Sequence, residues 1–73
     1  MTIQNFKIFL DLVKTLHFGK TSRNQFITPA TLTRLIQRLE QEVGSPLFER
    51  DNRSVSLTTS GYLFRDYCIR QIE

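Results

Sequence analysis

The sequence predicts a mainly α-helical fold of the winged helix-turn-helix class, with three helices, a two-stranded wing and the start of a further helix. Three observations indicate this class: a strongly capped helix over residues 29–43, a short polar segment before it, and an alternating apolar segment after it. The chain has 73 residues, which is enough for one small domain with a small core.

The first helix is predicted from the segment TIQNFKIFLDLVKTL, residues 2–16. Its main face has apolar residues at helical spacing, namely Phe6, Phe9, Leu10, Val13 and Leu16. Ile8 and Leu12 widen this face beyond the stripe that a surface helix needs to bury. Because a small domain has little interior to cover so broad a face, we expect a second contact here, with another subunit.

A short, weak helix is predicted over residues 20–26, docked through Phe18, Phe26 and Ile27. Asn24 and Gln25 do not fit this interpretation, because they fall where such a helix should bury a side chain. His17 has no acidic partner or nucleophile in a nearby motif, so we interpret it as a helix-end residue and not a catalytic one.

The helix over residues 29–43 has strong signals at both ends. Thr28 suits the N-cap, Pro29 suits the first helical position, and Gly44 suits the left-handed residue that ends a helix. The apolar stripe is Leu32, Leu35, Ile36, Leu39 and Val43. The opposite side has no acid among its members, which are Ala30, Thr33, Arg34, Gln37, Arg38 and Gln41.

The segment 47–57 is predicted to form the wing, a hairpin with a turn at Asp51-Asn52. A last helix follows over residues 59–73, capped by Thr58, and we expect Gly61 to permit close packing in its first turn. Its expected apolar side is Leu63, Phe64, Tyr67, Cys68, Gln71 and Ile72. No stop signal follows, so we expect this helix to continue in a longer chain.

Composition excludes several other classes of protein. No apolar run is long enough for a membrane span, no signal peptide is evident, and the lone Cys68 fits the reducing cytoplasm. One Cys and one His cannot form a zinc site within one chain. No nucleophile–base pair, metal cluster or phosphate-binding loop is visible, so neither an enzyme nor a cofactor is predicted.

The charge distribution favours double-stranded DNA as the partner. The net charge is only +3, but residues 20–39 contain four basic residues and no acid. In a helix-turn-helix, the second helix lies in the major groove, where short side chains permit close approach and Arg or Gln can bind base edges. Arg53 in the wing would meet phosphate or the minor groove. Two alternatives stay open: an ordinary solvated helix face, and a helical interaction domain that binds an acidic partner.

The sequence resembles the N-terminal DNA-binding domain of LysR-type transcriptional regulators over nearly its whole length. The most specific matches are ATLTRLIQRLEQEVGSPLFER and VSLTTSG. Thr21, Ser22, Gln25 and Leu35 depart from the family pattern. The family's DNA-contacting positions correspond to Thr28, Pro29, Ala30, Thr33, Arg34, Arg38 and Arg53, with Thr31 near the same edge; Gln37 joins them from the outer-face pattern.

The resemblance also implies how the chain is organised. Residues 1–58 would be the winged helix-turn-helix domain, and residues 59–73 the start of a linker helix that pairs with a second subunit. We therefore expect a homodimer through the first and last helices. A small-molecule inducer would bind only a full-length relative, because the family's effector-binding domain is absent here. A truncated remnant that no longer regulates is a further alternative.

Overall fold

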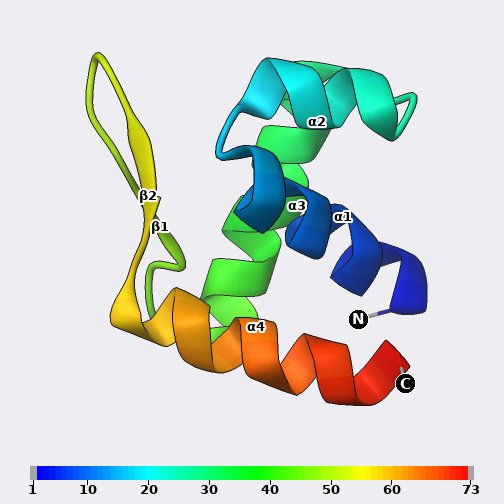
Figure 1. Ribbon diagram of the computed structural model, residues 1–73, viewed down its shortest axis with the longest axis vertical. Coiled ribbons are helices and arrows are strands. Elements are labelled where there is room, and N and C mark those ends of the chain that lie inside the picture. Colours follow the sequence, from blue (N-terminus) through cyan, green and yellow to red (C-terminus); the bar gives the residue numbers. More distant parts are fainter. Residues whose placement is uncertain (1, 73) are drawn as a thin grey trace.

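Four helices and one antiparallel hairpin form the domain in the computed structural model, which describes residues 2–72. In chain order they are α1 (Ile3–Thr15), α2 (Phe18–Asn24), α3 (Pro29–Val43), β1 (Phe48–Arg50), β2 (Val55–Leu57) and α4 (Thr59–Ile72). The hairpin projects from the helices, and α4 crosses one end of the molecule (Figure 1). The predicted order of elements is confirmed.

The caps that the sequence predicted for α3 and α4 are present. Thr28 Oγ1 accepts a hydrogen bond from the Thr31 amide at 3.1 Å, and Gly44 ends α3 in the left-handed region with φ of 84°. Thr58 Oγ1 accepts from the Gly61 amide at 2.9 Å, which fixes the start of α4. Capping depends on a few neighbouring residues, so these helix ends follow directly from local sequence.

The prediction that Ile8 and Leu12 of α1 face outward, toward another subunit, is wrong. Ile8 is 4% exposed and Leu12 is 0% exposed within the single chain. The reason is that α1 contacts both α2 and α4, so its broad apolar face is covered from two sides. Leu16, expected on the main buried face, is instead partly exposed as the left-handed C-cap of α1.

Aromatic rings at the centre of the core join α1, the hairpin and α4. The ring of Phe9 lies 5.5 Å from that of Phe48 and 4.9 Å from that of Phe64, measured between centroids. Cys68 is also fully buried, and burial raises the pKa of its thiol to about 11, so the thiol stays protonated at neutral pH. This core fixes the hairpin and α4 against α1.

Helix α2 begins at Phe18 and ends at Asn24, two residues earlier at each end than expected. His17 is its N-cap, and its Nδ1 accepts a hydrogen bond from the Lys20 amide at 3.0 Å, so the interpretation of His17 as a helix-end residue is confirmed. The expectation that Phe26 docks this helix is wrong. Phe26 is 95% exposed with φ of 58°, because the connection to α3 needs a left-handed residue that points its side chain into solvent.

The polar residues of α2 that did not fit the sequence pattern have partners in the structure. Asn24 and Gln25 both donate hydrogen bonds to the Asp11 carboxylate of α1, each at 3.2 Å. Thr21 is buried and its hydroxyl lies 2.8 Å from that of Thr15, while the Ser22 hydroxyl donates to the Gly19 carbonyl. Thr21 and Gln25, which depart from the family pattern, therefore form hydrogen bonds to α1, whereas that of Ser22 stays within α2.

Helix α4 packs through Gly61, Phe64 and Cys68. A Cβ on Gly61 would collide with the Leu47 carbonyl oxygen and the Leu57 side chain, so the expected close packing is confirmed. Of the expected apolar side, Phe64 and Cys68 are buried, whereas Leu63 is 68% exposed. Among residues 2–72, the helices are all too short or too polar to cross a membrane.

Candidate nucleic-acid interface

The orientation of α3 is set by its buried apolar residues, Leu32, Ile36 and Leu39, which are at most 4% exposed. The opposite side of the helix is consequently open to solvent. The structure brings the candidate residues of the cap and α3 together on this side: Thr28, Pro29, Ala30, Arg34, Gln37 and Arg38 are exposed, and Thr31 and Thr33 are half-buried at its margins. We call this surface the α3 face.

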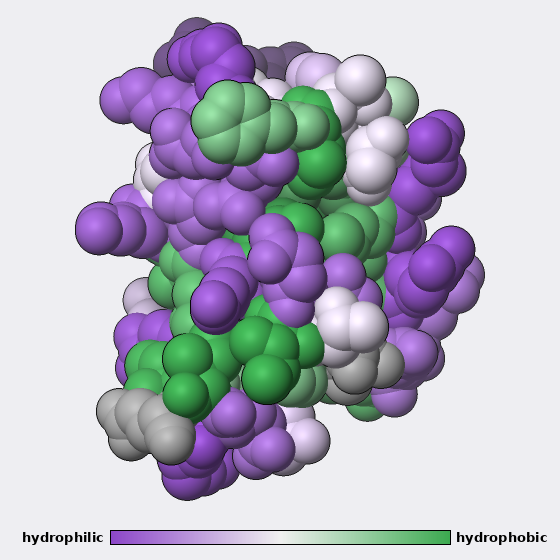
Figure 2. All heavy atoms as spheres, turned by 90° about the vertical axis from the view of Figure 1, so that its right-hand side faces the viewer, coloured by the Kyte–Doolittle hydropathy of each residue, from purple (hydrophilic) through white to green (hydrophobic). Residues whose placement is uncertain are grey.

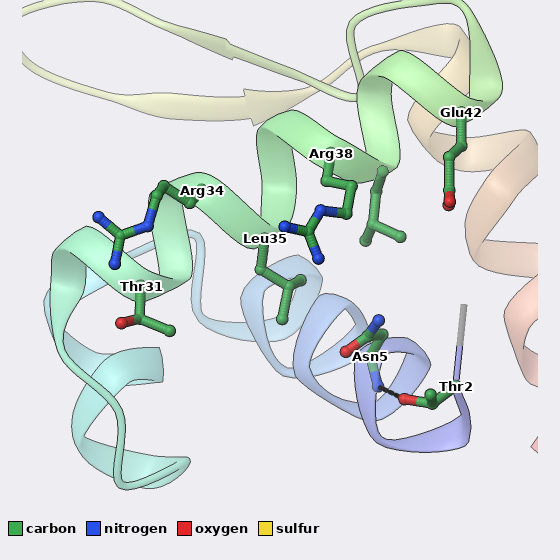
Figure 3. Close-up of a pocket in the computed structure, with 8 residues that line it drawn as sticks. Thr2, Asn5, Thr31, Arg34, Leu35, Arg38 and Glu42 are labelled. Carbon is green, nitrogen blue, oxygen red and sulfur yellow. Dashed lines mark hydrogen bonds between the residues drawn. The ribbon is translucent and has the colours of Figure 1, made fainter.

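On one side of the α3 face, a groove of about 410 Å³ separates α3 from the start of α1. Thr2 and Asn5 line it from α1, and Arg38 points across it toward them, whereas Arg34 points away from α1 (Figure 3). Leu35 is half-buried against the core at the bottom of the groove, so an apolar residue suits this position.

On its other side, the α3 face meets the hairpin across a smaller groove of about 200 Å³, lined by Thr33, Gln37 and Glu40. The Glu40 carboxylate accepts hydrogen bonds from the Leu47 amide at 2.8 Å and the Phe48 amide at 3.4 Å. These bonds join α3 to the start of the hairpin. The sequence alone assigned Glu40 no role, because nothing in its local pattern indicates amides seven and eight residues later.

The wing turn is formed by Asp51, as the sequence predicted. Its Oδ1 accepts hydrogen bonds from the Arg53 amide at 2.7 Å and the Ser54 amide at 2.8 Å. These two backbone hydrogen bonds, of which the one from Arg53 has the larger effect, hold the pKa of the Asp51 carboxyl below its usual value. Because the folded-state pKa is lowered, this contribution to stability is present at neutral pH and is lost as the pH falls through that pKa. Arg53 is exposed in this turn. The turn lies at the far end of the hairpin, away from α3 (Figure 1).

Among residues 2–72, the arginines of the α3 face have no carboxylate within ion-pair distance. In the part of the chain that the structure describes, the ion pair present joins Arg65 and Asp66 of α4, at 3.0 Å. Glu40 is engaged by the hairpin amides, and Glu42 lies at the far end of the groove beside α1. The α3 face therefore presents positive charge and hydrogen-bond donors beside short side chains.

Residues 3–62 match the family model of the bacterial regulatory helix-turn-helix proteins of the lysR family. The chain belongs to this family. It is 49% identical over 61 residues to the HTH-type transcriptional activator IlvY of Salmonella typhimurium, which covers 84% of this chain and 21% of that protein. It is 43% identical over 61 residues to the HTH-type transcriptional regulator IlvR of Caulobacter vibrioides. This match covers 84% of this chain and 21% of that protein.

Solved structures of LysR-family proteins have the same fold. The BenM_DBD/benA site 1 DNA complex superposes with a TM-score of 0.88 at 33% identity and covers 99% of this chain and 81% of that chain. A LysR family regulator, VV2_1132, gives a TM-score of 0.91 at 29% identity, over 99% of this chain and 25% of that one. The chain thus spans about a fifth of the curated LysR-family relatives named above, and it corresponds to their helix-turn-helix part. This family consists of transcriptional regulators and not of enzymes.

Proposed function

We propose that this domain binds double-stranded DNA sequence-specifically, as the DNA-binding part of a bacterial LysR-family transcriptional regulator in the cytoplasm. The observation that supports this most directly is the α3 face, where Arg34 and Arg38 lie beside short residues without a neutralising carboxylate. The similarity to BenM_DBD, whose structure was solved with DNA, supports the same function. Arginines on an exposed helix face, without an ion-pair partner among residues 2–72, supply hydrogen-bond donors for phosphates and bases.

In this proposal, α3 (residues 29–43) lies in the major groove. Arg34 and Arg38 would bind guanine or phosphate, Gln37 would bind adenine, and the methyl groups of Ala30 and Thr33 would contact thymine. Thr28, Pro29 and Thr31 lie at the N-terminal end of the helix, which approaches base edges in this class of domain. The wing (residues 47–57) would place Arg53 on the DNA backbone or in the adjacent minor groove.

Replacing Arg34 tests base recognition. We expect Arg34→Ala to weaken binding to the preferred site by about 1–3 kcal/mol and to relax the preference at one base pair, because a bidentate contact to one base would be lost. The sites would be selected from random-sequence DNA, and affinities measured by electrophoretic shift. Arg65→Ala on α4 is the matched control and should leave both affinity and preference unchanged. An equal loss on every sequence would assign Arg34 to phosphate and not to a base.

The alternative is an interaction domain that binds an acidic protein. It predicts no salt-dependent binding to DNA. DNA binding by the α3 face should weaken steeply as salt concentration rises, because phosphate contacts release counterions. A purified domain that shows no such salt-dependent binding to any selected duplex would favour the acidic-protein partner instead.

We further propose that residues 1–58 form the DNA-binding domain and that α4, within residues 59–73, belongs to a homodimer interface. The exposed apolar residues of α4 are Tyr62, Leu63, Tyr67, Ile69 and Ile72, and Ile3 at the start of α1 adds to them. Hydrophobic residues gather on the lower part of the face that Figure 2 shows. A two-fold interface there would place two α3 helices on half-sites about one helical turn apart, or a multiple of it.

Replacing Leu63, which is 68% exposed, tests this interface. We expect the wild-type domain to dimerise weakly as its concentration rises in sedimentation equilibrium, and Leu63→Asp to stay monomeric, because a charge in an apolar contact is costly. Phe26→Asp makes the same kind of change outside α4 and should leave the dimer intact. A wild-type domain that is still monomeric at millimolar concentration would rule this interface out.

A further inference from the structure

Arg50, at the end of β1, lies over the ring of Phe18, with its guanidinium carbon 4.2 Å from the ring centroid. The ring itself is held from behind by the core. Phe18 packs edge-to-face against Phe48 at 6.4 Å between centroids, and Phe48 is 7% exposed and packs on Phe9. The flexible arginine side chain is thus placed on a fixed surface at the junction of α2 and the hairpin.

The charge of Arg50 is not neutralised within the domain. Its neighbour Glu49 projects from the opposite side of the strand, because successive side chains alternate. Asp51 accepts the amides of the wing turn, and Glu40 accepts those of Leu47 and Phe48. Within residues 2–72, Arg50 has no carboxylate at ion-pair distance. Its exposed guanidinium therefore keeps N–H donors for an anion from outside the chain.

The position of Arg50 indicates which anion this is. Arg50 and Phe18 line the groove toward the α3 face together with Thr33 and Gln37, and they also line the groove toward the wing tip with Arg53. When α3 lies in the major groove and the wing tip meets the next minor groove, the sugar–phosphate strand that separates the two grooves must pass between α3 and the hairpin. Arg50 lies on that path.

We propose that Arg50 binds a backbone phosphate of the DNA strand between α3 and the wing, and that Phe18 is the positioning residue that holds the guanidinium for this contact. This inference rests on the proposed DNA binding. A planar guanidinium can stack on a ring and still direct its N–H groups at a phosphate. Stacking also reduces the rotamer freedom that the side chain would otherwise lose on binding.

The test measures the affinity for a fluorescein-labelled duplex, recovered by selection from random-sequence DNA, over a series of salt concentrations. Arg50→Ala is expected to lower the slope of log affinity against log salt by about 0.9, as for one lost phosphate contact. Phe18→Leu keeps an apolar side chain but removes the ring, and should weaken binding by about 2- to 5-fold, the fold-change that corresponds to a cation–π contact. Phe18→Tyr keeps an aromatic ring, and this variant should bind the duplex as tightly as the wild-type domain.

The double variant, Phe18→Leu with Arg50→Ala, separates positioning from a merely structural role. We expect it to bind no more weakly than Arg50→Ala alone, because Phe18 acts through Arg50. Thermal unfolding of each variant, followed by circular dichroism, shows whether the fold is retained. Arg65 also lies over an aromatic ring, that of Tyr62 at 5.0 Å, but on α4, and Arg65→Ala is the matched control with an unchanged slope.

Two results would overturn the inference separately from the proposed function. One is an unchanged salt slope for Arg50→Ala while the wild-type domain binds the duplex and Arg34→Ala weakens that binding. The other is an equal effect of Phe18→Leu with and without the Arg50 side chain. A wild-type domain that does not bind the duplex at all would instead overturn the proposed function, and this inference with it.

Discussion

Phe9→Ala is expected to lower the free energy of unfolding by about 3–5 kcal/mol, which is a large part of the stability of a domain of this size. Phe9 is fully buried, and its ring contacts those of Phe48 and Phe64, so its removal opens a cavity where α1, the hairpin and α4 meet. Urea unfolding followed by circular dichroism measures the effect.

The matched control is Phe26→Ala, because the same atoms are removed from a side chain that is 95% exposed. We expect this variant to change the free energy of unfolding by less than about 0.5 kcal/mol, as is usual for exposed positions. Similar losses for the two variants would contradict the central place of Phe9 in the core.

Gly61→Ala is expected to destabilise the domain by about 3 kcal/mol, at the upper end of what overpacking costs. The added methyl group would meet the Leu47 carbonyl oxygen, which is backbone, and would lie 2.7 Å from Leu57 Cγ. Because a carbonyl cannot rotate away like the end of a side chain, α4 must shift from the hairpin. Thermal and urea unfolding would both report the loss.

Gly44→Ala provides the comparison for Gly61. A Cβ on Gly44 has open space around it, but its φ of 84° is unfavourable for alanine, so only backbone strain of about 1 kcal/mol is expected. If Gly61→Ala cost no more than Gly44→Ala, the contact between α4 and the hairpin would be looser than the structure indicates.

The sequence predicts those parts of the fold that depend on neighbouring residues. Thr28 and Gly44 define α3 to the residue, and the acid-free pattern of its outer side identifies the α3 face, because the caps and the helical period are local. Asp51 likewise indicates the turn of the wing.

Features that depend on contacts between distant segments could not be predicted in this way. Ile8 and Leu12 looked like surplus apolar surface, since nothing local shows that α2 and α4 cover α1 from two sides. Phe26 was expected to dock the short helix, although the connection between α2 and α3 exposes it. At the candidate site, the local sequence likewise does not indicate that Glu40 accepts the Leu47 amide or that Arg50 lies over the Phe18 ring.

The Glu40 carboxylate gives the domain a fixed geometry before any partner arrives. It binds the amides of Leu47 and Phe48, so α3, proposed for the major groove, and the hairpin, proposed for the adjacent minor groove, are joined at their base. Little entropy would then be lost in aligning the two elements on binding. The distance between α3 and the hairpin would then be fixed before binding. A duplex whose groove spacing differs from this distance would have to deform. The free-energy cost of that deformation depends on the DNA sequence, even at base pairs that no side chain contacts.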